Sequence, residues 1–414
     1  MPAKDIIHRQ IIGHLPAISA WFESQSLDFQ YPVYTSYDIR DSGFKVAVVD
    51  ANIYPAGFNN ICPVDRKNAP ALLSLYLDRH YGPELKDLLL LTEEHTHNTY
   101  YWQNVKALQK IILATGKNLK IAIPTDFAGP VMRVAADGTE IEVHSAQRSE
   151  KGVRIGDFVP QLIISNNDFS NSYESWSDGL IWPMNPPREL GWYRRKKSCY
   201  FDQYNEVVSE FAKLIEVDPW LLQVETKNFV DFDLSVTEKR EALAGQVDGM
   251  LKRLSEKYNQ HGIQEEPFVV VKNNSGTYGL AVMKVHRGEE ILNFNYKSRK
   301  KMKAAKGGGE VSEVIVQEGI SSVVAADGVV AEPAIYMLGC GLAGGFLRAH
   351  SEKGPQDSLN SPGAVYKRMC VSDLQVSVEG HPMEKVCGWD ARIGLLAVGR
   401  EARQMNVEYL GYRQ

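Results

Sequence analysis

The sequence predicts an α/β protein (α+β overall), and three observations support this. Helix-like and strand-like stretches alternate through the first half, strands with glycine turns prevail from Pro267 onward, and the composition (44% hydrophobic, 23% charged) is that of a soluble globular protein. At 414 residues the chain is long enough for two or three structural units. We expect an α/β substrate- and metal-binding unit at 1–190, a helical connector at 191–265 and a nucleotide-binding unit at 266–414.

Short apolar runs and helix-period stretches follow one another through the first two units. The expected strands are Phe44–Val49, Leu88–Leu91, Leu119–Ile123 and Gln161–Ser165. The expected helices are the amphipathic N-terminal stretch 1–25, Ala69–Tyr81, Trp102–Thr115 closed by Gly116, and, in the connector, Tyr204–Ile215 and Val236–Tyr258. Strands that alternate with helices are typical of a parallel, helix-covered sheet, so we expect the four strands to share one.

Composition and charge exclude several classes of protein. A net charge of −5 and a pI near 6.1 argue against a nucleic-acid partner. No run approaches the roughly 18 apolar residues of a membrane span, and the N-terminal stretch is too polar for a signal peptide. The cysteines are scattered without a C-x-x-C pair: Cys62, Cys199, Cys340, Cys370 and Cys387. They predict reduced thiols, no covalent nucleophile and a cytoplasmic location.

The most informative segment is a strand, a lysine, a polar glycine-containing turn and a second strand. Val269–Val271 leads to Lys272, and the turn from Asn273 to Gly279 follows. Such a turn can fold its N–H groups over a polyphosphate while the lysine pairs with the phosphates. The Walker A order is absent, and an ordinary hairpin with a surface lysine is the alternative. The candidate ligands in the turn are Asn273, Asn274, Ser275, Gly276 and Gly279.

Two further segments complete a candidate nucleotide site. The strand Val314–Ile320 can lay its backbone against an adenine edge through Gln317, Glu318, Gly319 and Ile320, with the Glu318 side chain near the amino group or the ribose. Lys196 and Lys197 lie at a helix start and would bring a second cation to the phosphates. A plain strand and a solvated helix terminus are the alternatives.

Polar residues at two strand ends are candidates for metal and substrate binding. Asp50 and Asn52 fall on one side of an extended segment and offer hard oxygen ligands for Mg²⁺, although an Asx turn before Pro55 is an alternative. Glu93 or Glu94, together with Asn98, is a candidate to hold an ammonium or amide group of a substrate. A metal site at the neighbouring histidines lacks a third ligand.

The motif G-x-G-x-x-G occurs at 339–344, but the stretch that follows is too short for a dinucleotide-binding helix. We expect instead two strands, Ala334–Leu338 and Gly345–Ala349, joined by a glycine turn. Arg348 then lies on a strand and can bind a carboxylate with its guanidinium. The basic segment Lys297–Gly309 is either a solvated helix and loop or a flap over anionic ligands.

Together these segments resemble the ATP-grasp ligases, in the arrangement of the eukaryotic-type glutathione synthetases. Asp50-Ala-Asn52 resembles that family's magnesium segment, and Gln317–Ile320 resembles its adenine hinge. Over nearly the full length the chain is more similar to the proteobacterial-type glutamate–cysteine ligases. The passages that carry this similarity are Asn166–Asn171, Trp182–Tyr193 and Glu332–Tyr336.

The resemblance implies an ATP-grasp fold and a ligase that makes γ-glutamylcysteine from L-glutamate, L-cysteine and ATP with Mg²⁺, through a γ-glutamyl phosphate. It assigns Lys272 and Arg348 to catalysis, and Arg348 also to a substrate carboxylate. The lysine turn lacks the acidic metal ligand of the synthetases, which Glu332 would replace. A glutathione synthetase-like enzyme, another glutamate–amine ligase and a non-catalytic ATP-binding regulator are the alternatives, and a homo-oligomer stays open.

Overall fold

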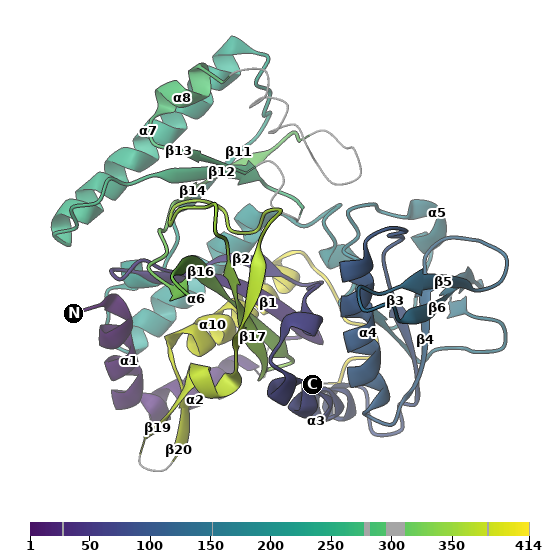
Figure 1. Cartoon of the computed structure of the whole chain (residues 1–414). Coiled ribbons are helices and arrows are strands. Elements are labelled where there is room, and N and C mark those ends of the chain that lie inside the picture. Colours follow the sequence, from purple (N-terminus) through teal and green to yellow (C-terminus); the bar gives the residue numbers. More distant parts are fainter. Residues whose placement is uncertain (27–28, 151, 277–281, 295–310, 379–380, 414) are drawn as a thin grey trace.

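The computed structural model describes residues 1–414 apart from 27–28, 151, 277–281, 295–310, 379–380 and 414. Figure 1 shows a central sheet, a second sheet beside it that carries β3 to β6, and a smaller unit formed by β11 to β14 with α7 and α8. The basic segment Lys297–Gly309 and Gly279 lie outside the described residues. Among the described helices, none is both long and apolar enough to cross a membrane.

The central sheet is antiparallel and draws its strands from both ends of the chain. Its order is β18-β17-β16-β1-β2, and β15 (Ala325–Ala326) pairs with β16. The strands are β1 (Tyr34–Asp41), β2 (Val46–Asn52), β16 (Val329–Leu338), β17 (Gly341–Ala349) and β18 (Val365–Met369). The helices α6 (Lys197–Leu214) and α10 (Val386–Gln404) pack against each other, and α10 also contacts β1 and β2. A Cβ at Gly394 of α10 would stand 2.6 Å from the Tyr37 ring, so glycine permits this close packing.

The second sheet has the order β10-β9-β3-β4-β6-β5. The strands β3 (Asp87–Leu91), β4 (Asn118–Ile123), β6 (Glu140–Ser145), β9 (Leu162–Ser165) and β10 (Met184–Asn185) pair in parallel, and β5 (Val131–Val134) is antiparallel to β6. Leu88 to Leu91 are all buried, as expected for a parallel strand covered on both faces. The helices of this unit are α3 (Pro63–His80), α4 (Thr99–Leu113) and the short α5 (Glu174–Ser177).

The smaller unit is a four-stranded sheet with its own hydrophobic core. Its order is β11-β14-β12-β13, with β11 (Thr226–Phe229), β12 (Val269–Asn273), β13 (Val282–Val285) and β14 (Val314–Glu318). The long helix α7 (Thr237–Gln260) and α8 (Gly288–Leu292) contribute to the same core. Apolar side chains of β12 and β14 pack there with those of α7, and this core is distinct from the larger core of the two other sheets.

Short elements complete the chain. The helices α1 (Ala3–Gly13) and α2 (Leu15–Ser26) form the N-terminal segment, and β7 (Gln147–Arg148) pairs with β8 (Val153–Arg154). The 3₁₀ turns are η1 (Phe58–Asn60), η2 (Arg188–Leu190), η3 (Pro219–Leu221) and η5 (Val371–Leu374), and β19 (Gln375–Val378) pairs with β20 (His381–Glu384).

The predicted α/β class is confirmed, and so is the parallel pairing of the strands around Leu88, Leu119 and Leu162. One strand was placed in the wrong sheet: Phe44–Val49 corresponds to β2, which is antiparallel to β1 in the central sheet. An apolar run in the sequence indicates that a strand is buried, but it does not indicate which strand it pairs with. The strands β16 to β18 pair with β1 and β2, so the three consecutive units expected from the sequence do not correspond to three sheets.

Two antiparallel strands, β16 and β17, meet at the glycine motif as expected, but only Gly339 and Cys340 join them, because β17 already begins at Gly341. The cysteine prediction was wrong in one respect. Cys62 and Cys370 form a disulfide, while Cys199, Cys340 and Cys387 are free. The two partners are 308 positions apart, so their spacing gave no signal. They meet because β18 ends beside the start of α3.

Candidate active site

Lys272 lies on β12, and its side chain reaches the central sheet. Its Nζ donates to the carbonyl oxygen of Val49 at 2.8 Å and lies 5.5 Å from the Phe201 ring. Burial lowers the pKa of Lys272 to about 8, although the nearby Asp50 carboxylate opposes that shift. A buried ammonium with one carbonyl partner can exchange that partner for a more strongly charged ligand.

Asp50 and two lysines from different elements come together at the end of β2. Lys197, the first residue of α6, forms an ion pair with Asp50. Burial by itself would raise the pKa of Asp50, but Lys197 and Lys272 outweigh it and lower the pKa to about 2. The carboxylate is therefore ionised, as a metal ligand must be. Lys196 is more exposed and pairs with Glu313 at 3.4 Å.

Asn52 follows Asp50 by two positions on β2 and so shares its face of the sheet. Opposite them on β1 stand Ser36 and Asp38, which pair with Asn52 and Asp50. The predicted pair of oxygen ligands is thus brought together at one strand end.

A buried charge network continues from Asp50 across the central sheet. Arg348 on β17 donates to Asp38 at 2.8 and 3.2 Å and to Glu332 at 2.7 Å. Arg40 on β1 pairs with the other oxygen of Glu332 at 2.5 Å. The Nε of Arg348 has no hydrogen-bond partner among the described residues. The sequence prediction placed Arg348 on a strand but missed Asp38 and Arg40, although both lie at alternate positions of one strand.

The candidate adenine-binding segment Gln317–Ile320 makes most of its polar contacts with other parts of the protein. Glu318 forms an ion pair at 2.6 Å with Lys45, which is completely buried, and its other oxygen accepts from the Glu225 N–H at 3.1 Å. Gln317 donates to Thr226 Oγ1 at 3.0 Å. β14 is hydrogen-bonded on both sides, by β11 and β12, and the N–H of Gly319 donates to Phe268 at 2.8 Å.

Both carboxylate oxygens of Glu318 are therefore bound within the protein, one by Lys45 and the other by the Glu225 N–H. The expected contact of its side chain with adenine therefore has no geometric support, and sequence reasoning missed Lys45. Adenine binding by the backbone around Gly319 and Ile320 stays a prediction.

The described part of the lysine turn is ordered by its own side chains. Ser275 donates its hydroxyl to the Arg195 carbonyl at 3.0 Å, and its N–H donates to Asn273 Oδ1 at 3.1 Å. Gly276 has φ +109°, a conformation that favours glycine. Asn274 is completely buried, and its bonds run within the protein.

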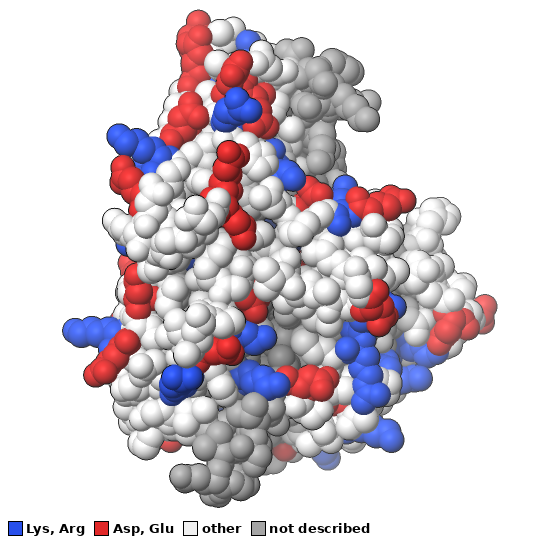
Figure 2. Space-filling view, turned by 60° about the vertical axis from the view of Figure 1, so that its left-hand side comes forward, with Lys and Arg blue, Asp and Glu red and all other residues white. Residues whose placement is uncertain are grey.

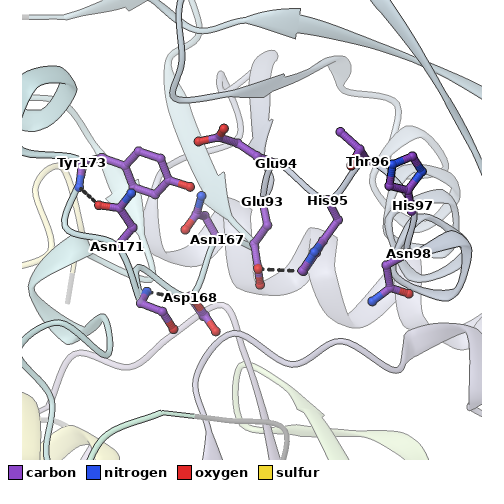
Figure 3. A pocket seen from close by; sticks show the side chains of 11 residues that line it. Glu93, Glu94, His95, Thr96, His97, Asn98, Asn167, Asp168, Asn171 and Tyr173 are labelled. Carbon is purple, nitrogen blue, oxygen red and sulfur yellow. Dashed lines mark hydrogen bonds and ion pairs between the residues drawn. The ribbon is translucent and has the colours of Figure 1, made fainter. Parts of the chain in front are cut away.

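A pocket of about 660 Å³ opens where β3 and β9 end (Figure 3). Its lining comes from two segments, 93–98 after β3 and 167–173 after β9, and includes the predicted Glu94 and Asn98. Glu93 pairs with His95 at 2.9 Å. Asn98 also caps α4 by accepting from the Tyr101 N–H at 3.0 Å. Carboxyl ends of parallel strands are common binding sites in α/β proteins.

The pocket is acidic. Three carboxylates line it, from Glu93, Glu94 and Asp168, and none of the described lining residues is lysine or arginine. Burial raises the pKa of Tyr173, with Glu94 adding to the effect, so the phenol stays neutral. Such a lining favours an ammonium group. By contrast, acidic and basic side chains are interspersed over the molecular face shown in Figure 2.

A short chain of contacts links the pocket to the site formed by Asp50, Lys197 and Lys272. Asn166 donates to the Pro55 carbonyl at 2.9 Å, which ties the end of β9 to the segment after Asn52. The N–H of Trp192 donates to the Asp168 carbonyl at 3.0 Å, and the Trp192 ring lies 4.7 Å from Lys197 Nζ. Asp168 and Asn167 were not predicted as site residues, although the polar run Asn166–Asn171 signals a strand end.

Comparison with known proteins identifies the family. The model of the glutamate–cysteine ligase family matches residues 8–402. The chain belongs to this family. A structure from Methylobacillus flagellatus KT, named as a γ-glutamylcysteine synthetase, is 32% identical, covers 97% of this ligase and 96% of its own chain, and has a TM-score of 0.86.

Two more distant structures are similar to this ligase. A glutathione synthetase-like effector of Globodera pallida is 12% identical, with a TM-score of 0.37, and covers 81% of the ligase and 74% of its own chain. A D-alanyl-alanine synthetase A of Vibrio cholerae is 10% identical, with a TM-score of 0.30, and covers 61% of the ligase and 68% of its own chain. No curated protein matched the ligase. The resemblance drawn from the sequence is confirmed.

Proposed function

We propose that this ligase joins L-glutamate to L-cysteine with ATP, forming γ-glutamylcysteine, ADP and phosphate, the first step of glutathione biosynthesis. Membership of the glutamate–cysteine ligase family supports the reaction and its use of ATP. The observation that carries the proposal is the meeting of Lys272, Lys197 and Asp50, from three separate elements, next to an acidic pocket.

In the proposed first step, an oxygen of the glutamate γ-carboxylate attacks the terminal phosphorus of ATP and the bond to ADP breaks. Negative charge accumulates on the transferring oxygens, and Lys272 and Lys197 would stabilise it. In the second step the cysteine amine attacks the acyl carbon, phosphate leaves and the amine loses a proton. No covalent attachment to the chain is needed.

The residues at the end of β2 fit a magnesium ion. Asp50 is ionised, and Asn52 lies on the same face, so both offer hard oxygens. Mg²⁺ bound there would neutralise phosphate charge. Lys197 contacts only Oδ1 of Asp50, so Oδ2 is the oxygen that would bind it. The oxygens of Glu332 are already paired with Arg40 and Arg348, so Glu332 is less accessible as a further ligand.

The acidic pocket would hold an amino-acid substrate by its ammonium group, with Glu94 as the principal partner and Asn98 beside it. A substrate carboxylate would be bound by Arg348, whose Nε is the guanidinium nitrogen without a described partner. Charge-assisted hydrogen bonds of this kind give both affinity and orientation.

The test is phosphate release from ATP and Mg²⁺ across pairs of substrates, with products identified by mass spectrometry. Release that requires glutamate and cysteine together, with γ-glutamylcysteine formed, supports the proposal. Release only with γ-glutamylcysteine and glycine would indicate a synthetase. ATP binding without release in any pair would indicate a non-catalytic nucleotide-binding protein.

A further inference from the structure

Asn274 is buried where the lysine-bearing elements meet. It lies two positions after Lys272, at the end of the same strand segment, and its side chain is completely excluded from solvent. The two hydrogens of its Nδ2 are shared among three acceptors, Ser198 Oγ at 3.1 Å, Asn228 Oδ1 at 3.0 Å and Glu313 Oε2 at 3.1 Å. One amide thus contacts α6, β11 and the residue preceding β14.

The same residue caps α6 from outside the helix. Lys196, the N-cap residue of α6, makes no capping bond with its side chain. Instead the N–H of Lys197 donates to the Asn274 carbonyl at 2.7 Å, and the N–H of Ser198 donates to Asn274 Oδ1 at 2.9 Å. The first turn of a helix has N–H groups without intrahelical partners, and here a neighbouring strand satisfies two of them.

This arrangement fixes the position of one lysine relative to the other. Lys272 is linked to Asn274 along the chain through the single residue Asn273, and the N–H of Lys197 donates directly to the Asn274 carbonyl. The ammonium groups of both lysines lower the pKa of Asp50. Because Asn274 already accepts from the N–H groups of Lys197 and Ser198, these two groups are not available to phosphate, and the lysine side chains would bind it.

We propose that Asn274 is a positioning residue rather than a ligand of the nucleotide. It holds Lys197 and Lys272 at a fixed position relative to each other for phosphoryl transfer. This inference rests on the proposed function, because it assigns a role to the two lysines in that reaction. An asparagine is suited to the task, since it accepts from α6 and donates to Asn228 and Glu313 at the same time.

The experiment is a double-mutant cycle with Asn274→Ala, Lys197→Ala and the combined variant, read as kcat/KM for ATP and as the calorimetric Kd for ATP. Misplacing a catalytic group by about 1 Å can cost on the order of 100-fold, so we expect Asn274→Ala to lower kcat/KM by about 10–100-fold. In the Lys197→Ala background the same change should cost less than about threefold, because residues that act as a unit are non-additive.

Asn205→Ala is the matched control. Asn205 lies on α6, donates to the Val224 carbonyl at 2.9 Å and accepts from the Val224 N–H at 3.0 Å, away from the lysines. It should lower thermal stability as Asn274→Ala does, while kcat/KM stays within about threefold of wild type in both backgrounds. If the alanine variant does not fold, Asn274→Ser replaces it in the cycle, because serine removes the amide without adding a charge beside Glu313.

Equal losses in both backgrounds, or an Asn274 variant that folds and keeps wild-type kcat/KM and Kd, would overturn the proposal. Failure of the proposed function is distinguishable, because it would appear as absent turnover in the wild type. The cycle on the Kd for ATP would then still decide whether Asn274 acts through Lys197.

Discussion

Replacing Lys272 with methionine should stabilise the free enzyme while greatly lowering its turnover. The Lys272 side chain is buried, and its pKa falls from an ordinary 10.5 to about 8 because burial penalises the charged form. At about 1.4 kcal/mol per pKa unit, the charged lysine costs the fold about 3 kcal/mol at pH 7. Methionine fills a similar volume without that cost. Asp50 keeps Lys197 as its partner, so no buried charge is left alone.

The size of the effect depends on pH. The folded protein loses the Lys272 proton near pH 8 and the unfolded chain near 10.5, so the penalty is complete below pH 8 and disappears as the pH rises toward 10.5. Urea unfolding should therefore show Lys272→Met gaining about 3 kcal/mol at pH 7 and much less at pH 10. In a coupled assay of ADP formation, turnover should fall about 10²–10³-fold.

Lys196→Met is the control for this experiment. The Lys196 side chain is 35% exposed and pairs with Glu313 at 3.4 Å. Its replacement should change stability by less than about 1 kcal/mol at either pH. A Lys272→Met variant that is less stable than wild type at pH 7, or that gains equally at pH 10, would refute the reasoning from burial. Near-normal turnover would remove Lys272 from the phosphate site.

Three other changes test the remaining parts of the site. Asp38→Ala removes the bidentate partner of buried Arg348 and should destabilise the protein by about 3–5 kcal/mol in urea unfolding; a loss under 1 kcal/mol would contradict the network. Thiol titration of the denatured, unreduced protein should find three thiols, and four in Cys62→Ser, whereas five in the wild type would contradict the bond to Cys370. Glu94→Gln should raise the KM of an amino-acid substrate about 10–100-fold with the KM of ATP unchanged, and unchanged values for both amino acids would exclude Glu94 from binding.

Sequence patterns located the parts of the site whose signals are local. Each of these signals is contained in a few consecutive residues. They are a lysine at the end of a β-branched run, an acidic residue two positions before an asparagine, and a basic helix start. The structure brings Lys272, Asp50 and Lys197 together. Their roles in binding stay predictions, but their meeting is an outcome that no single segment could have shown.

The features that were missed depend on contacts between distant segments. Lys45 and Glu318 are 273 positions apart, and nothing in either segment indicates that one neutralises the other. Asn98 is different, because an asparagine before a helix is a common N-cap and that local signal was available. Asn274 was predicted as a ligand because polar turn residues often bind phosphate. Its burial became apparent only from the packing of α6 on the hairpin.

The central sheet has a consequence for how the protein is made. β1 emerges from the ribosome early, yet its neighbour β16 and the partner of Asp38 on β17 follow some 300 residues later, with 310 positions between Asp38 and Arg348. At about 5–20 residues per second, the nascent chain waits on the order of tens of seconds with this strand edge unpaired. A prematurely terminated chain would leave Asp38 and Arg40 without their partners. Translation must therefore be nearly complete before the reaction centre can form.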